Sequence, residues 1–286
     1  MLKKSLLNVF SNVMRIGRVQ HRQTESGNKM TLKAALIDLS GTLHVEDEAT
    51  PNAVEALERL RASGVIVKFV TNTTKESSNT LYNRLCKIGF NLKKEEIYSS
   101  LSAAVNYIKL HKLNPYYLVS EDARTDFPPY DNTKPFDSVA IGLAPKEFHY
   151  DNLNKAFNIL LANKCNQLIA IHQGKYYKTN NGLALGPGSF VKGLQFATGT
   201  EPIVIGKPNE YFFKSAIPAD IRPEECVMIG DDANDDIEGA MSAGLKGILV
   251  KTGKYRKEVV ISPEPTALVE NFNSAVDWII SVNTSI

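Results

Sequence analysis

The sequence is poor in cysteine and has no long hydrophobic run, and each shortage excludes a class of protein. Only three cysteines occur in 286 residues: Cys86, Cys165 and Cys226. An odd, scattered set of this kind fits neither a disulfide framework nor a zinc site, and it suits a reducing compartment. No apolar run is long enough to span a bilayer, so we expect no membrane partner.

The chain also lacks a large excess of charge of one sign. Its formal net charge is +2, from 33 basic and 31 acidic residues. Residues 1–29 alone carry a net charge of +5, which leaves −3 for the remainder. A mildly acidic body argues against a nucleic-acid-binding surface, so we expect no nucleic-acid partner.

The first 29 residues have the composition of a targeting segment, because they are basic and poor in acids. Five apolar residues stand there at helical spacing: Leu6, Leu7, Phe10, Val13 and Met14. This pattern is typical of a mitochondrial transit peptide. The alternative is a disordered or upstream-extended start, since Met30 precedes the first predicted strand and could itself initiate translation. We therefore treat residues 1–30 as an N-terminal extension of a cytoplasmic protein, or of a mitochondrial one if the segment is a transit peptide.

Strands alternate with helices along most of the remaining chain. Apolar runs predict buried strands near residues 34–37, 65–70, 96–99, 116–119, 202–205, 226–229 and 247–250. Between the first two strands, Thr50 and Pro51 have the residue types of an N-cap and a first helical position. The alternation predicts an α/β fold built on a doubly wound parallel sheet.

The segment 114–201 differs from its surroundings because it is punctuated by prolines and has strands and a helix of its own. The sequence Asn180-Asn181-Gly182 within it predicts the turn of a β-hairpin. We predict an inserted α/β domain over residues 114–201 and a core domain over residues 31–113 and 202–286. The alternative is that this segment continues the core sheet.

Four of the predicted strands end in polar residues of complementary chemistry. Asp38 with Ser40, Thr71 with Asn72, Lys207, and the acidic stretch 231–236 each follow an apolar run. The carboxyl ends of parallel strands lie along one edge of a sheet, so we expect these residues to converge. Each has a simpler explanation alone: Asp38 or Thr71 and Asn72 could form a turn, and Lys207 could be a solvated loop lysine.

The acidic stretch Asp231, Asp232, Asp235 and Asp236 places four carboxylates within six residues. Like charges repel by about 1 kcal/mol or more each in a low-dielectric setting, so we expect a divalent cation among them. A donor set made only of oxygens favours Mg²⁺ over zinc or copper. The alternative is a group of acids at a helix N-terminus, which would explain one or two of the four.

In chain order, these stretches resemble the four motifs of the haloacid dehalogenase (HAD) superfamily. The matching residues are Asp38-Leu39-Ser40-Gly41-Thr42, Thr71-Asn72, Gly206-Lys207-Pro208, and Gly230-Asp231-Asp232 with Asp236. The insertion is similar to the large α/β cap of NagD-like phosphatases. The resemblance implies a HAD-like Rossmannoid core with an inserted cap, and a Mg²⁺-dependent phosphatase acting on small phosphorylated compounds.

The resemblance also implies how the acids are used. Asp38 would attack phosphorus and form an aspartyl-phosphate that water then hydrolyses. Mg²⁺ would be held by the Asp38 carboxylate, the main-chain carbonyl of Ser40 and Asp231. Asp232 and Asp236 would lie next to these ligands without binding the ion themselves. Asp236 would orient metal-bound waters or Lys207.

The remaining motif residues would bind the substrate. The resemblance implies that Thr71 and Asn72 donate hydrogen bonds to the phosphoryl oxygens, as would main-chain N–H groups near Leu39 and Ser40. Lys207 would neutralise charge between the nucleophile and the phosphate, and we count it with the nucleophile as catalytic.

The resemblance further implies that the cap closes over the site, excludes water and selects the leaving group. Tyr176, Tyr177 and residues 186–189 are our candidates for specificity. Related capped phosphatases often dimerise through the cap, so a homodimer is a further expectation, beside a small phosphorylated substrate.

Ser40 departs from the family pattern, because most of these phosphatases carry a second Asp there as general acid and base. Positioned proton transfer contributes about 10²–10⁴-fold to a rate, and a serine hydroxyl cannot replace it efficiently at neutral pH. Substrates would then be those whose leaving groups need little protonation, such as pyrophosphate or phosphoramidates. The alternative is a weakly active or inactive protein that binds phosphate. A metal-independent dehalogenase is disfavoured by Lys207 and the acidic stretch.

Overall fold

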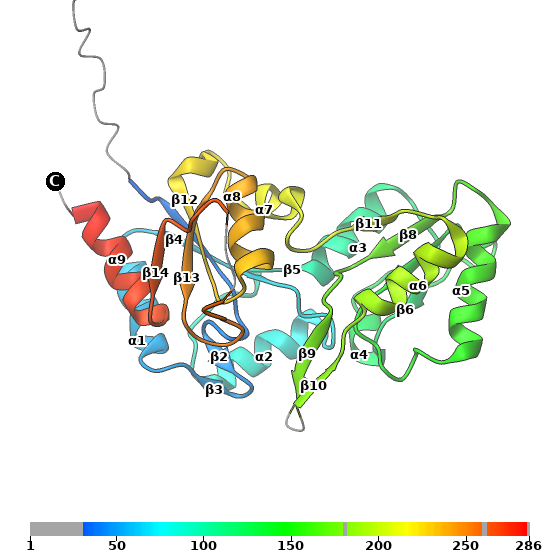
Figure 1. Cartoon of the computed structure of the whole chain (residues 1–286), viewed down its shortest axis with the longest axis horizontal. Helices are drawn as coiled ribbons and strands as arrows, with labels where there is room; N and C mark the ends of the chain where they lie inside the picture. The colour runs from blue at the N-terminus through cyan, green and yellow to red at the C-terminus, as the bar shows by residue number, and fades with distance from the viewer. Residues whose placement is uncertain (1–30, 180–181, 259–261, 285–286) are drawn as a thin grey trace, which may run out of the picture.

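The computed structural model describes residues 31–179, 182–258 and 262–284, which form two α/β domains side by side (Figure 1). The predicted N-terminal extension, residues 1–30, lies outside the described residues. One domain is built on a six-stranded sheet and the other on a four-stranded sheet, and we call them the core and the cap. Two short hairpins accompany these sheets.

The core sheet is parallel throughout, with strand order β14-β13-β12-β1-β4-β5. Its strands are β1 (Ala34–Ile37), β4 (Ile66–Thr71), β5 (Ile97–Ser99), β12 (Cys226–Gly230), β13 (Lys246–Val250) and β14 (Ala267–Val269). The chain adds β4 and β5 on one side of β1 and later adds β12, β13 and β14 on the other. Ligands of such sheets bind at the carboxyl ends of the strands where the order reverses, which here is beside β1. The predicted doubly wound parallel sheet is confirmed, and β14 is a strand that the apolar pattern did not predict.

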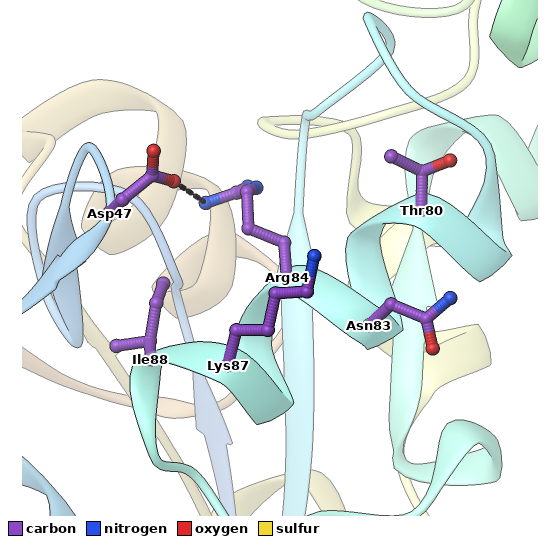
Figure 2. A pocket seen from close by; sticks show the side chains of 6 residues that line it. All are labelled: Asp47, Thr80, Asn83, Arg84, Lys87 and Ile88. Atoms are coloured by element: carbon purple, nitrogen blue, oxygen red, sulfur yellow. Dashed lines mark ion pairs between the residues drawn. The ribbon is translucent and has the colours of Figure 1, made fainter.

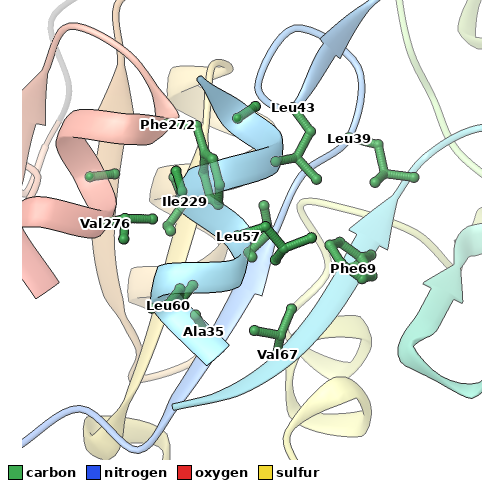
Figure 3. Packing of buried hydrophobic residues seen from close by; sticks show 14 of the residues in the cluster. Ala35, Leu39, Leu43, Leu57, Leu60, Val67, Phe69, Ile229, Phe272 and Val276 are labelled. Atoms are coloured by element: carbon green, nitrogen blue, oxygen red, sulfur yellow. The ribbon is translucent and has the colours of Figure 1, made fainter. Parts of the chain in front are cut away.

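One face of the core sheet is covered by α1 (Ala53–Ala62), α2 (Ser78–Ile88) and α9 (Phe272–Thr284). Figure 3 shows Leu57 of α1 directed at Phe69 of the sheet and Leu60 beside Ala35. Residues of α9 complete the cluster, with Phe272 beside Ile229. Helix α1 buries positions 53, 56, 57 and 60, which is the spacing of one helical face. Burying a leucine side chain stabilises the fold by about 1.5–3 kcal/mol, so this helix is held by its packing.

Thr50 does not cap α1, contrary to the sequence-based prediction. Its hydroxyl donates to the carbonyl oxygens of Thr42 at 2.9 Å and Leu43 at 3.1 Å. It thereby ties down the turn before the small hairpin of β2 (His44–Val45) and β3 (Glu48–Ala49). The helix begins after Asn52, which has a left-handed backbone and makes no side-chain cap. A threonine hydroxyl can serve either purpose, and here the tertiary contact prevails.

The cap sheet is also parallel, in the order β11-β8-β7-β6. Its strands are β6 (Pro115–Leu118), β7 (Ser138–Ile141), β8 (Gln167–Ala170) and β11 (Pro202–Val204), and its helices are α4 (Glu121–Arg124), α5 (Tyr150–Ala162) and α6 (Gly188–Thr198). The predicted hairpin is present as β9 (Tyr176–Thr179) and β10 (Gly182–Leu185). The strand at 202–204 is a correction, because we had placed it in the core and it pairs with β8 of the cap. An apolar run does not specify which of two parallel sheets it joins.

Between the two sheets lie α3 (Ser100–Leu110), α7 (Glu210–Ala216) and α8 (Gly239–Ser242), and two short 3₁₀ turns precede β5 and β12 at Lys94–Glu96 and Pro223–Glu225. One buried apolar cluster joins the domains here, since it contains Leu36 and Val70 of the core, Leu101 of α3, and Ile169 and Ile171 of the cap. The core and the cap therefore share part of their interior.

Candidate active site

Three adjacent core strands bring acids and hydroxyls to the carboxyl edge of the sheet. Asp38 directly follows β1, Thr71 ends β4, and Asp231 directly follows β12. Asp38 and Asp231 are 6% and 1% exposed, although carboxylates are rarely buried without a partner. The predicted convergence of these strand ends is present.

The partner of the buried carboxylates is Lys207, which is 3% exposed. Its Nζ lies 2.6 Å from Oδ1 of Asp38 and 2.6 Å from Oδ1 of Asp236, and it also donates to the carbonyl of Val70 at 3.3 Å. Lys207 follows β11, so it reaches the site from a cap strand and not from the core strand that we had predicted. One ammonium thus bridges two carboxylates in a buried site.

Burial and mutual repulsion control the ionisation of this group. Burial alone would lower the pKa of the Lys207 ammonium, but the charges of Asp236 and Asp38 outweigh it and raise that pKa. Burial raises the pKa of Asp236 to about 7, although the Lys207 charge acts in the opposite direction. Burial, followed by the charge of Asp38, raises the pKa of Asp231 well above its ordinary value. The site holds more negative charge than a single lysine compensates.

The carboxylates are spaced as a cation would require. Oxygen atoms of Asp38, Asp231 and Asp236 lie within 4.8 Å of one another. The main-chain N–H of Lys254 donates to Oδ2 of Asp231 at 2.7 Å, and the contacts of Asp38 with Lys207 use Oδ1. The other oxygen of each carboxylate can therefore face a cation. A donor set of oxygens alone fits Mg²⁺.

Two glycines make room for the Asp231 carboxylate. A Cβ atom on Gly41 or on Gly253 would collide with Oδ2 of Asp231. Both glycines have positive φ, 97° for Gly41 and 52° for Gly253, a region that side chains rarely adopt. Thr252 Oγ1 donates to the carbonyl of Gly41 and so joins the two loops that flank the carboxylate.

Asp232 and Asp236 face different partners. Asp232 caps the π-helical turn Ala233–Glu238, accepting hydrogen bonds from the N–H groups of Asn234 and Asp235 at 3.1 and 3.0 Å. Asp236 accepts from Lys207 and, at 3.1 Å, from the N–H of Asp232. The helix-terminus explanation therefore applies to Asp232, while Asp231 and Asp236 belong to the buried site.

The last residue of β4 and the residue that follows it carry the predicted phosphate-binding side chains, Thr71 and Asn72. Thr71 Oγ1 accepts a hydrogen bond from the N–H of Thr73 at 3.2 Å. Asn72 and Lys207 form a reciprocal pair, with Asn72 Nδ2 donating to the Lys207 carbonyl and the Lys207 N–H donating to Asn72 Oδ1, both at 3.0 Å. The Asn72 amide thus holds the main chain of Lys207, and its contact with phosphate stays a prediction.

The turn after β1 carries the two other predicted substrate-binding residues. The Leu39 side chain is fully buried in the apolar cluster under α1, so only its main chain can face a ligand. Ser40, in the same turn, is exposed. The site therefore has a hydroxyl at Ser40, the position at which the motif described above usually has a second Asp.

The fold also brings to this edge two residues, Lys254 and His172, that are not among the predicted site residues. Lys254 Nζ lies 3.2 Å from Oδ2 of Asp232, and its positive charge also acts on Asp231. His172, which follows β8 of the cap, has Nε2 3.1 Å from Thr74 Oγ1. Each is a single side chain in a loop, without a repeating pattern that could have marked it.

A hollow of about 530 Å³ lies apart from this edge, beside α2 and the β2–β3 hairpin (Figure 2). Its lining residues are Asp47, Thr80, Asn83, Arg84, Lys87 and Ile88. Arg84 turns toward Asp47 at 3.9 Å and is held more closely by Glu76 at 2.6 Å. The hollow contains none of the motif residues, so its volume does not identify the chemistry.

The sequence matches family models that agree with this site. Residues 35–129 match the haloacid dehalogenase-like hydrolase model, and residues 204–275 match a second HAD-hydrolase-like model. The chain belongs to the haloacid dehalogenase-like hydrolase family, as these matches and two curated relatives show.

Two curated relatives cover nearly the whole fold. Rat haloacid dehalogenase-like hydrolase domain-containing protein 2 is 52% identical over 255 residues, which are 88% of this chain and 97% of the relative. Human phospholysine phosphohistidine inorganic pyrophosphate phosphatase is 35% identical over 256 residues, covering 87% of this chain and 94% of the relative. The family resemblance inferred from the motifs is confirmed.

Solved structures with a similar fold include phosphatases. Glycerol phosphate phosphatase from Mycobacterium tuberculosis, solved in complex with magnesium, has a TM-score of 0.75 and 27% identity, covering 85% of this chain and 76% of its own. 4-Nitrophenylphosphatase from Thermotoga maritima has a TM-score of 0.77 and 22% identity, covering 87% of this chain and 97% of its own. The latter, at 22% identity, supports the fold and nothing finer.

Proposed function

We propose that the protein is a Mg²⁺-dependent phosphatase that acts on small phosphorylated compounds through an aspartyl-phosphate at Asp38. The observation that carries this proposal is the buried contact between Asp38 and Lys207, 2.6 Å long, beside Asp231. A buried carboxylate that is held by an ammonium and open on its other oxygen is suited to attack an electrophile.

In this proposal, Asp38, Asp231 and the main-chain carbonyl of Ser40 would hold Mg²⁺. When bound, the ion would offset the repulsion between the anionic nucleophile and the anionic substrate. Lys207 holds Asp38 in place and adds positive charge where the phosphoryl group would lie. Asp236 keeps the Lys207 ammonium directed at Asp38, because it fixes the other side of the same nitrogen.

The chemistry proceeds in two displacements. Asp38 forms a bond to phosphorus while the bond from phosphorus to the leaving group breaks, and the leaving group takes the electron pair. Water then attacks phosphorus while the bond from phosphorus to Asp38 breaks and the carboxylate takes the electron pair. The protons of the water leave with the inorganic phosphate, which restores Asp38. Thr71, Asn72 and the main chain of Leu39 and Ser40 would bind the phosphoryl oxygens during both steps.

Ser40 restricts the substrate class, because a neutral hydroxyl does not protonate a poor leaving group at neutral pH. We therefore propose substrates whose leaving groups depart without such help, such as pyrophosphate or phosphoramidates. The name of the phospholysine phosphohistidine inorganic pyrophosphate phosphatase relative, 35% identical, supports this class.

A second candidate function is a weakly active or inactive phosphate-binding protein on the same fold. Ser40 is the observation that favours it, since the residue that most often transfers protons is absent. Such a protein would bind phosphate or Mg²⁺ and release little product.

The oligomeric state and the compartment are further parts of the proposal. We propose a homodimer formed through the cap, which is supported by exposed aromatic residues on its outer helices, Phe196 and Tyr150. No helix among residues 31–179, 182–258 and 262–284 has the length and apolar character to cross a membrane. Residues 1–29 would decide between the cytoplasm and mitochondria.

The test is phosphate release from p-nitrophenyl phosphate and from pyrophosphate, with Mg²⁺ and with EDTA. We expect release that requires Mg²⁺ and that Asp38→Asn abolishes, while Asp47→Asn at the exposed hollow leaves it unchanged. Equal, slow release by the wild type and Asp38→Asn would contradict the proposal. Phosphate binding without turnover would then favour the second candidate.

A further inference from the structure

The cap holds one short segment of the core, residues 74–78, which we call the latch segment. It begins two residues after Asn72 and ends at Ser78, the first residue of helix α2. At its buried end, Thr74 is 1% exposed and its Oγ1 accepts a hydrogen bond from the N–H of Leu143, after β7, at 2.9 Å. His172, after β8, contacts the same oxygen at 3.1 Å. Residues that follow two cap strands therefore contact the same core hydroxyl.

The surrounding hydrogen bonds define which nitrogen of His172 carries the hydrogen. The main-chain N–H of Gly174 donates to Nδ1 at 3.1 Å, so Nδ1 is an acceptor and the neutral ring carries its hydrogen on Nε2. Nε2–H then donates to Thr74 Oγ1, which accepts two hydrogen bonds from the cap. A Cβ atom on Gly142 would lie 3.3 Å from Cβ of Thr74, so the packing leaves this contact little freedom.

The outer end of the latch segment is held by helix α4 of the cap and by residues on either side of that helix. The contacts are Ser120 Oγ to the Lys75 carbonyl, Ser77 N–H to Asp122 Oδ2, and both the N–H and Oγ of Ser78 to Asp126 Oδ2, each 2.7 Å long. The carboxylates lie at the N-terminus of α2, where its free N–H groups favour negative charge. Hydrogen bonds of charged groups are stronger than neutral ones, so the cap grips both ends of the segment.

We propose that the latch segment lets the cap set the position of Thr71 and Asn72, and that His172 is a positioning residue at its buried end. The inference rests on the proposed function, because it assigns Thr71 and Asn72 to the phosphoryl group. Asn72 also holds the main chain of Lys207, so a shift of the segment reaches the catalytic lysine. The cap then acts on the phosphoryl group that all substrates share, and not only on the leaving group.

The experiment measures kcat, KM and inhibition by inorganic phosphate for Thr74→Val and His172→Ala. A misplacement of about 1 Å in a site costs up to about 100-fold in rate, so we expect kcat/KM to fall about 10- to 100-fold. The factor should be the same for p-nitrophenyl phosphate and pyrophosphate, and the inhibition constant of phosphate should rise with it. Thr74→Ser and His172→Gln keep the hydroxyl and the Nε2 donor, and both should restore most of the activity.

Asp151→Asn, on the exposed side of α5, is the matched cap control and should change nothing. If Thr74→Val does not fold, Asp126→Asn tests the outer end, with a smaller rise in the phosphate inhibition constant. An unchanged inhibition constant, or a loss that depends on the leaving group, would overturn the inference. Failure of the proposed function is separate, because the wild type itself would then release no phosphate.

Discussion

The core and the cap are both parallel α/β sheets, yet the residues at their carboxyl ends differ in kind. Core strands end in Asp38, Thr71 and Asp231, which are charged or hydroxylic. Cap strands β7 and β8 lead into the main chain of Leu143 and the neutral ring of His172. The core thus supplies the reactive carboxylates, while the cap supplies positioning contacts and, after β11, the single ammonium of Lys207.

The difference has an energetic cost on the core side only. Asp38, Asp231 and Asp236 are buried around one lysine, and buried ion pairs contribute little net stability because desolvation offsets their attraction. The contacts of Leu143 and His172 with Thr74 are hydrogen bonds between neutral groups, which contribute about 1 kcal/mol each. We therefore expect changes among the buried charged groups to affect activity most.

Lys207→Met should have the largest effect. It leaves Asp38 and Asp236 buried without their shared cation, and removing one partner of a buried pair costs about 3–5 kcal/mol of unfolding free energy. Phosphate release should fall about 10²–10³-fold, because a group that stabilises the developing charge is lost. Urea unfolding in EDTA and phosphate release measure the two effects. Lys214→Met, which breaks an exposed pair with Glu210, should change neither.

Gly41→Ala should weaken Mg²⁺ binding more than it lowers the stability of the fold. Its Cβ would enter the space of the Asp231 carboxylate. The Mg²⁺ concentration for half-maximal activity should rise about 10- to 100-fold, as when a group that orients a metal ligand is disturbed. Gly64→Ala is the control, because Gly64 also has positive φ, 84°, but open space around it. If both variants shift the Mg²⁺ requirement equally, backbone strain and not the carboxylate is responsible.

His172 should make the cap contact sensitive to acid. Burial, with the charges of Lys254 and Lys207, lowers the pKa of His172 to about 4 from 6.5. The unfolded chain takes up a proton below pH 6.5 and the folded one does not, so stability is fully present above pH 6.5 and is lost as the pH falls toward 4. The loss should reach about 3 kcal/mol at most, at 1.36 kcal/mol per pKa unit. Denaturant unfolding at pH 7 and pH 4.5 measures this loss of unfolding free energy. If His172→Gln loses as much unfolding free energy between the two pH values as the wild type, the assignment to His172 is contradicted.

Two helix caps give the smallest and finest comparison. Ser99 caps α3 and Ser120 caps α4, through hydrogen bonds from Ser102 N–H at 3.0 Å and Ala123 N–H at 3.2 Å. Replacing either by Ala should cost about 1 kcal/mol of unfolding free energy. Only Ser120 also donates to the latch segment, at Lys75, so only Ser120→Ala should raise the inhibition constant of phosphate. Equal inhibition constants in the two variants would show that this contact does not position the site.

Much of the catalytic edge could be predicted from the sequence, because strand ends of a parallel sheet converge by geometry. Asp38, Thr71 and Asp231 come together for that reason, and their roles with Ser40, Leu39 and Asn72 stay predictions. Lys207 was predicted at the site but from the wrong sheet. Its strand, β11, is an apolar run of three residues, and nothing in such a run distinguishes two parallel sheets.

Other features depend on contacts between distant segments, which leave no local pattern. Thr50 has the residue type of a helix cap, but its hydroxyl is taken by a turn. Strand β14, only three residues long, forms where β13 offers a free edge. His172 and Lys254 gain their surroundings only when the cap and the loop after β13 fold against the core. Pattern reasoning therefore works for strand ends and fails for single side chains.

The apolar cluster that joins the two domains has a consequence for which molecules can be processed. Asp38 is 6% exposed, so a phosphorylated compound must pass between core and cap to reach it. A wide separation of the core from the cap would expose Leu36, Val70 and Ile171 to water. This exposure costs a free energy of about 25 cal/mol per Å² of apolar surface. We expect compact phosphates to be admitted far faster than phosphorylated proteins, and the ratio of turnover of pyrophosphate to that of a phosphoprotein would reveal such a size limit.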